Sequence, residues 1–129
     1  NTLWIVLPSG RRLAYIKPKL QPNRFGRMAV TFEGLGANNK WVRQETYSGK
    51  ITENITQATA RDLLAEAMKR LEDKGFDIVG HVHDEVILEV PKGSTTVDEV
   101  CGIMNQNPAW TEGLPLSSAG YTGNYYFKD

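Results

Sequence analysis

The first fifty residues alternate between apolar and polar positions in short runs, a pattern typical of β-strands. Turn residues such as Gly, Pro and Asn separate the runs. We interpret residues 17–27, which contain Pro18 and Pro22, as a loop. The pattern predicts an antiparallel sheet or paired hairpins, with strands at residues 3–7, 13–16, 28–32 and 41–47.

A long helix is predicted next, beginning between Lys50 and Glu53 and ending near Lys74, with Gly75 as the residue that follows its C-terminus. At 100° per residue, one apolar face contains Ala60, Leu64, Ala67, Met68 and Leu71. A second apolar face, nearly opposite, contains Ile51, Ile55 and Ala58. The N-terminal half should therefore be covered on two sides. On the C-terminal half we expect solvated charged residues at Glu66, Lys69, Arg70 and Asp73.

A polar stripe on this helix lies between the two apolar faces and contains Asn54, Gln57 and Arg61. Polar side chains beside buried faces need hydrogen-bonding partners. Those partners are either internal or nucleic acid, and the residues alone favour internal ones.

Two further strands are predicted on either side of His83, Asp84 and Glu85, at residues 77–82 and 86–90. The acidic pair Asp84 and Glu85 should therefore sit at the tip of a tight hairpin. Exposed carboxylates at fixed positions suit a hard cation such as Mg²⁺. Acidic residues are also common in turns for purely local reasons.

The last third of the chain predicts a short helix from Thr96 to about Asn105, because residues 96–99 have the spacing of a capping box. Residues 114–117 and 121–127 should be extended, and the second of these could add a strand to the hairpin. The predicted fold class is α+β, with a mainly antiparallel sheet, one long helix and one short helix.

Length and composition predict one domain over residues 1–129, of a protein that works in the cytoplasm. The first residue is Asn rather than Met, so we expect a piece of a longer protein. The single cysteine, Cys101, excludes an internal disulfide, and no apolar run is long enough to span a membrane.

The formal net charge is zero, but the charges are unevenly distributed along the chain. Residues 1–50 contain nine Lys and Arg against two Glu, and residues 51–129 contain six against thirteen acids, or about +7 and −7. The segment from Arg11 to Arg27 contains no acid, so it is a candidate for binding a phosphate backbone. The cations in it are Arg11, Arg12, Lys17, Lys19, Arg24 and Arg27.

The helix motif Gln57-x-x-Ala60-x-Asp62-Leu63, followed by Val82-His83-Asp84-Glu85, resembles the C-terminal palm of family A DNA polymerases, the DNA polymerase I type. The sequence of residues 54–62 most resembles the phage and prophage branch of this family. The resemblance is strong from Gly49 to Pro91 and looser in the flanks.

The resemblance implies template-directed DNA synthesis with two Mg²⁺ ions, in a bacterial or phage-infected cell. Asp84 would be one of two aspartates that bind both ions, and Glu85 would add negative potential beside it. Gln57 and His83 match residues that touch primer-template DNA near the insertion site, where both can donate to minor-groove acceptors. The implied partners are primer-template DNA, deoxynucleoside triphosphates and the rest of the polymerase chain.

The chain departs from the family pattern in several places. Many relatives have Asn four residues before the Gln, where this chain has Glu53; Asn54 lies three residues before it. Arg61 replaces a small residue, and could bind phosphate or pair with an acid such as Asp62 or Glu85. The motifs Asp-Tyr-Ser-x-Ile-Glu and Arg-x-x-x-Lys-x-x-x-Phe-Gly, which supply the other metal-binding aspartate and the triphosphate clamp, do not occur.

Two alternatives therefore remain open. The first is a non-catalytic DNA-binding or assembly module. The second is an unrelated metal-dependent nuclease that uses Asp84 and Glu85. A nuclease would need a third ligand near the hairpin, and only His81 and Asp62 are plausible.

Overall fold

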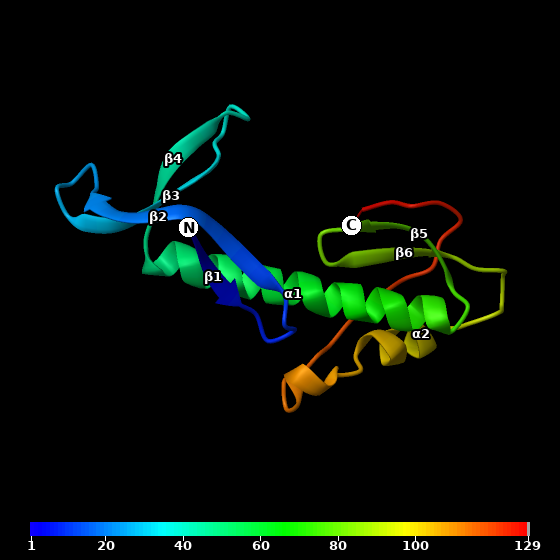
Figure 1. The fold of residues 1–129 in the computed structure, drawn as a ribbon. Coiled ribbons are helices and arrows are strands. Elements are labelled where there is room, and N and C mark those ends of the chain that lie inside the picture. Colours follow the sequence, from blue (N-terminus) through cyan, green and yellow to red (C-terminus); the bar gives the residue numbers. More distant parts are fainter. Residues whose placement is uncertain (129) are drawn as a thin grey trace. The chain divides into compact units, whose positions relative to one another are not determined.

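The computed structural model describes residues 1–128, and these form two compact units that divide at Thr59 and Ala60. Both units contain antiparallel strands and part of a helix, which confirms the predicted α+β class (Figure 1). The long helix α1, Ser48–Asp73, contributes its N-terminal half to the first unit and its C-terminal half to the second.

The first unit contains a four-stranded antiparallel sheet in the order β1-β2-β3-β4. A short turn that contains Gly10, at φ +89°, connects the first two strands, and Leu7 and Tyr15 are buried. Ile51, Ile55 and Ala58 of α1 are half-buried, which confirms that this side of the helix is covered. The strand bounds are Thr2–Val6 for β1, Arg12–Pro22 for β2, Met28–Leu35 for β3 and Trp41–Thr46 for β4.

The predicted loop at residues 17–27 was wrong for its first half, because β2 continues to Pro22. The pairing register of β2 with β3 shifts between Ile16 and Lys19, so the strand bulges at Lys17 and Pro18. Proline has no N–H to donate and is tolerated at such an irregularity. Lys17 adopts φ +46°, a left-handed conformation in the bulge that a proline-based rule cannot anticipate.

The second unit is built around the C-terminal half of α1, in which Leu64, Ala67 and Leu71 are buried as predicted. The helix ends in a Schellman motif: Gly75, at φ +88°, donates to the Glu72 carbonyl, and the Phe76 N–H donates to the Leu71 carbonyl. Gly75 is therefore the residue after the helix, as the sequence predicted.

A hairpin and a short helix follow in this unit. The hairpin pairs β5, Asp77–Val82, with β6, Glu85–Glu89. Helix α2, Val97–Met104, begins at the capping residue Thr96, which accepts a hydrogen bond from the Glu99 N–H at 3.2 Å. A single turn of 3₁₀-helix, η1, covers Ala109–Thr111. These elements confirm the predicted hairpin and capped helix.

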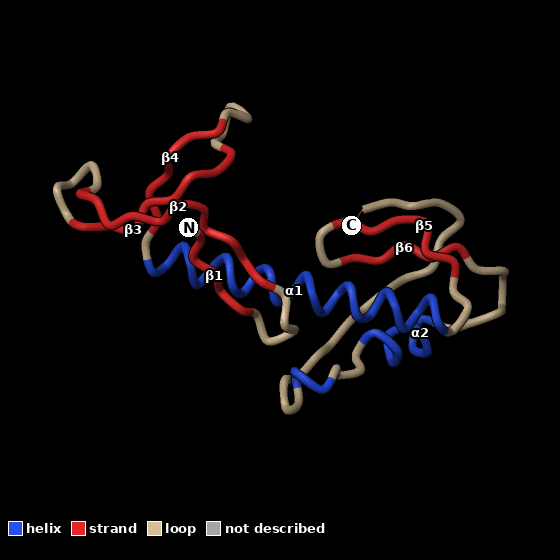
Figure 2. Tube along the Cα trace, viewed as in Figure 1, coloured by secondary structure: helices blue, strands red, loops and turns tan. Residues whose placement is uncertain are grey.

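Two expectations for the second unit were wrong. Residues 121–127 form no strand beside the hairpin, whose sheet has two strands among the described residues (Figure 2). Arg70, expected in solvent, is half-buried and donates to the carbonyls of Ile103 and Met104 at 3.1 and 3.2 Å. It therefore supplies a cation to the C-terminus of α2, where helix carbonyls lack partners.

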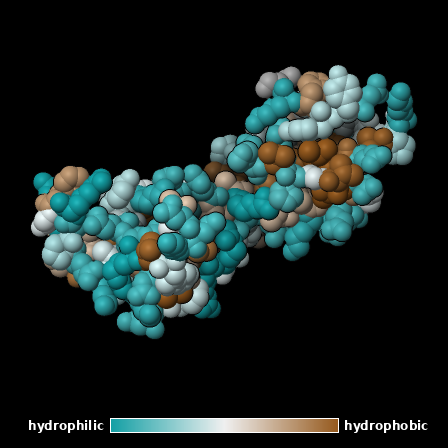
Figure 3. Space-filling view, turned by 90° about the horizontal axis from the view of Figure 1, so that it is seen from above, coloured by the Kyte–Doolittle hydropathy of each residue, from teal (hydrophilic) through white to brown (hydrophobic). Residues whose placement is uncertain are grey.

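The surfaces of the two units differ. Figure 3 shows mostly hydrophilic residues on the visible face of the first unit, and hydrophobic side chains gathered on the face of the second unit that carries the hairpin. Val79 of β5 is 55% exposed. No helix among residues 1–128 is both long and apolar enough to cross a bilayer.

Candidate nucleic-acid interface and acidic hairpin

The β5–β6 turn places the acidic residues, and it consists of His83 and Asp84. His83 has φ +53°, a conformation that few side chains other than Asn, Asp and His adopt. Both turn residues are exposed, while Glu85 is half-buried as the first residue of β6. Asp84 therefore lies at the tip of the hairpin, as predicted. Glu85 is the residue after the turn and pairs with Val82 of β5.

Glu85 has a neighbour that the sequence did not predict. The hydroxyl of Tyr126 donates to the Glu85 carboxylate at 3.5 Å, although the two residues are far apart in the chain. Asp84 points to no such partner among the hydrogen bonds and ion pairs of the described residues. The turn thus carries one exposed carboxylate and, beside it, a second carboxylate in contact with a phenol.

The donor set of the hairpin fits part of a Mg²⁺ site. Mg²⁺ takes oxygen ligands and is commonly held by one or two carboxylates plus waters and substrate phosphates. Asp84 and Glu85 match the carboxylates. Among residues 1–128, however, no group of three or more His, Cys, Asp or Glu side chains lies together as a metal-binding cluster. His81 and Asp62 do not complete such a cluster, so the described residues do not supply the extra ligand that a nuclease needs.

The polar stripe on α1 has internal partners at each of its three members. Asn54 donates to the Tyr15 hydroxyl at 3.1 Å, which ties the helix to β2. Gln57 donates to Glu53 at 3.2 Å, one turn earlier in the same helix, and stays exposed. The internal interpretation holds most clearly for Asn54, because its partner is in another element.

A shallow hollow of about 340 Å³ lies beside this stripe in the first unit. Asn54 and Gln57 of α1 line it together with residues of β2 and β3, namely Leu13, Ala14, Tyr15 and Phe32. The rings of Tyr15 and Phe32 pack edge to face, with their centroids 5.0 Å apart. Tyr15, which the sequence did not single out, therefore fixes Asn54 and forms one wall of the hollow.

Arg61 lies in the second unit, and its guanidinium is 3.3 Å from Nδ1 of His81 in β5. A guanidinium can only donate, so Nδ1 must accept and His81 must carry its ring proton on Nε2 when neutral. The sequence had offered phosphate or an acid as the partner of Arg61, and did not identify this histidine. Gln57 and His83 belong to different units, so the expectation that both touch primer-template DNA near the insertion site stays a prediction.

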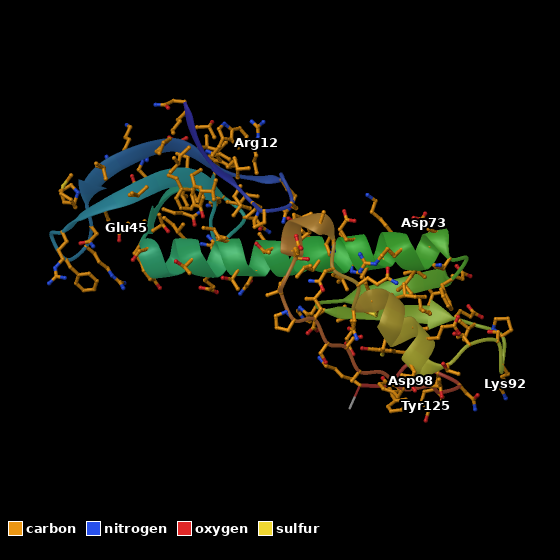
Figure 4. All side chains as sticks on the ribbon, turned by 90° about the horizontal axis from the view of Figure 1, so that it is seen from below. Arg12, Glu45, Asp73, Lys92, Asp98 and Tyr125 are labelled. Atoms are coloured by element: carbon orange, nitrogen blue, oxygen red, sulfur yellow. The ribbon has the colours of Figure 1, made fainter. Side chains whose placement is uncertain are left out.

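The cations of the basic segment fall into two groups. Arg11 donates to the Ala58 carbonyl at 3.0 Å, and Lys17 forms an ion pair with Glu33 at 3.0 Å. Arg12 and Lys19 are exposed, and their side chains have no hydrogen-bond or ion-pair partner among the described residues. Arg12 lies on the face of the sheet turned away from α1 (Figure 4).

Glu33 is the centre of a small charge network on the sheet. It accepts hydrogen bonds from Lys17 and from the Trp41 indole, and it pairs with Arg43 at 3.2 Å. The hydrogen bond from Lys17, with that from Trp41 and the nearby positive charges, lowers the pKa of Glu33. This network neutralises Lys17, so Lys17 is a weaker candidate for a phosphate contact than Arg12 or Lys19.

Comparisons with known proteins give one informative match. The chain is 52% identical over 128 residues to a protein named DNA polymerase from Bacillus phage SP02. The match covers 98% of this chain but 20% of the phage protein, so the chain spans about a fifth of that curated relative. No protein-family model and no solved structure matches the chain. The chain is thus similar to one part of a phage DNA polymerase.

Proposed function

We propose that this chain is the C-terminal palm portion of a family A DNA polymerase and contributes to template-directed nucleotidyl transfer. The observation that carries the proposal is the 52% identity over 128 residues to the phage DNA polymerase. The hairpin adds support, because it presents Asp84 on a short, paired support rather than on a long loop. Polymerase chemistry needs carboxylates held at fixed positions.

Three residues at the tip of the hairpin, His83, Asp84 and Glu85, each have a proposed role. Asp84 would hold Mg²⁺, and Glu85 would contribute negative potential from the start of β6. Bound Mg²⁺ would stabilise the charge that develops on the oxygens around the transferred phosphoryl group. His83, fixed in the turn beside Asp84, would donate to a minor-groove acceptor of the primer-template, as would Gln57 from α1. Such contacts test base-pair shape without reading sequence.

The other candidate DNA-binding residues differ in how freely their side chains can contact DNA. Arg12 and Lys19 are exposed and have no ion pair with any of residues 1–128, so they are suited to bind phosphates without first breaking a contact. To bind a phosphate, Arg11, Lys17 and Arg61 would each have to give up an existing contact or share it with the phosphate. Asn54 already donates to Tyr15, so we assign it mainly to positioning of the helix.

The metal site proposed for this chain is incomplete. One exposed aspartate with one neighbouring glutamate cannot surround two ions, because each needs several oxygen ligands in fixed geometry. We therefore expect the 129-residue chain alone to extend no primer and to cut no DNA in Mg²⁺ or Mn²⁺. Metal-dependent cleavage that Asp84→Asn abolishes would favour the nuclease instead.

A positive test uses the phage relative as the remainder of the enzyme. The matching segment of the Bacillus phage SP02 polymerase is replaced by this chain, and primer extension by the chimera is measured. Because the two segments are 52% identical, the chimera should fold and synthesise DNA. A folded chimera that binds primer-template but synthesises none would contradict the proposed function. A non-catalytic module predicts that second result.

A further inference from the structure

The loop between β2 and β3 is unusually well fixed for an exposed turn. The side-chain oxygen of Asn23 accepts hydrogen bonds from the backbone N–H groups of Phe25 and Arg27, at 2.9 and 3.0 Å. The Asn23 N–H donates to the Arg27 carbonyl at 2.7 Å, and Gly26, at φ +75°, donates back to Asn23 at 2.9 Å. The backbone of the loop is therefore held by hydrogen bonds within the loop itself.

These side chains are an aromatic ring and two cations. Phe25 is 72% exposed, and the guanidinium carbon of Arg24 lies 4.8 Å from the centre of its ring. Arg27 is also exposed. The backbone N–H of Arg24 donates to the Glu45 carboxylate at 3.2 Å, which ties the loop to β4. The loop thus exposes a phenyl ring that packs against no core, with one ring face stacked on Arg24.

The chemistry of this loop selects its ligand. An exposed ring with one guanidinium on its face, and a second exposed arginine two residues along the chain, matches the stacking and phosphate contacts by which proteins bind single-stranded nucleic acid. In a duplex the bases are already stacked on each other, so the ring suits an unpaired base. No acid occurs in residues 1–32, and the Glu45 carboxylate beside the loop is held by the Arg24 backbone N–H. The two arginine side chains therefore favour a polyanion over an apolar peptide.

We propose that the loop Asn23–Arg27 binds single-stranded nucleic acid. Phe25 stacks on an unpaired base with its free ring face, and Arg24 and Arg27 contact the neighbouring phosphates. This site lies in the first unit, whereas Asp84 lies in the second. The inference goes beyond the proposed polymerase function and does not rest on it, because a chain without polymerase activity would still bind a single strand.

The test is fluorescence anisotropy of the 129-residue chain with a labelled oligothymidylate and, separately, with a labelled duplex. Loss of one stacked base predicts that Phe25→Ala weakens single-strand binding by about 5- to 150-fold. Phe25→Tyr, which keeps an aromatic face, should bind as wild type. The matched control is Tyr125→Ala, which removes another exposed ring, 77% exposed, from the second unit and should change nothing.

The charged residues have a separate readout. Arg24→Gln with Arg27→Gln should reduce the salt slope of single-strand binding by about 1.4, since each phosphate contact to a single strand contributes about 0.7. Circular dichroism and the urea midpoint verify that each variant is folded. The proposal is overturned if the wild type does not bind the oligothymidylate. It is equally overturned if folded Phe25→Ala binds it unchanged, or loses duplex affinity to the same degree.

Discussion

Neutralising Arg12 and Lys19 together tests whether these two cations of the first unit carry affinity for duplex DNA. Both side chains are exposed and lack an ion-pair partner among the described residues, whereas Lys17 is paired with Glu33. The perturbation is Arg12→Gln with Lys19→Gln. Because neither side chain is buried, we expect the variant to fold as the wild type does.

The magnitude follows from counterion release. Each phosphate contact to duplex DNA contributes about 0.9 to the slope of log affinity against log salt. Two lost contacts should lower the slope by about 1.8. Between about 50 mM and about 200 mM salt, wild-type affinity should therefore fall about 12-fold more than that of the variant.

The assay is anisotropy with a labelled duplex at several salt concentrations and with two unrelated sequences. The matched control is Lys69→Gln with Lys92→Gln, which removes the same charge from exposed positions of the second unit. It should leave the slope unchanged, and both sequences should bind alike. Equal slopes for the double variant and the wild type, or tight binding that ignores salt, would refute the reasoning.

Two further predictions concern stability. Arg70→Met should lower the free energy of unfolding by about 2 kcal/mol, because two carbonyls of α2 lose a charged donor; urea denaturation should show the loss for Arg70→Met and not for Lys69→Met. The hydrogen bond from Lys17, with that from Trp41 and the nearby positive charges, lowers the pKa of Glu33, so the stabilising effect of Glu33 exists above the unfolded-state pKa and is lost as pH falls through the folded-state pKa. The Tm difference between wild type and Glu33→Gln should therefore shrink from neutral pH to about pH 3, and a constant difference would contradict this.

The sequence correctly predicted those elements that are determined by residues close together in the chain. The hairpin at residues 77–89, the N-cap at Thr96 and the Gly75 terminus each depend on a few neighbouring residues, and each is observed. The continuation of β2 through Pro18 was missed, because the bulge depends on pairing with β3. The presence of a proline alone does not show whether the strand continues by pairing with β3.

For the candidate site, the sequence predicted the position of Asp84 in the hairpin but not the contacts between distant parts of the chain. The position of Asp84 follows from the strands around it, so the sequence placed it correctly at the turn. The contacts of Arg61 with His81 and of Tyr126 with Glu85 join residues that are distant in the chain. No local pattern encodes such contacts. The solvated role expected for Arg70 failed for the same reason, since its partners belong to α2.

The most direct measurement of the central claim is primer extension by the chimera of the Bacillus phage SP02 polymerase and this chain. We predict that Asp84→Asn removes nearly all synthesis, while Glu85→Gln costs much less and Asp73→Asn, a matched change at the exposed end of α1, costs nothing. Binding of primer-template should persist in all three variants. Synthesis by the Asp84→Asn chimera at the wild-type rate would contradict the claim that Asp84 holds a catalytic metal ion.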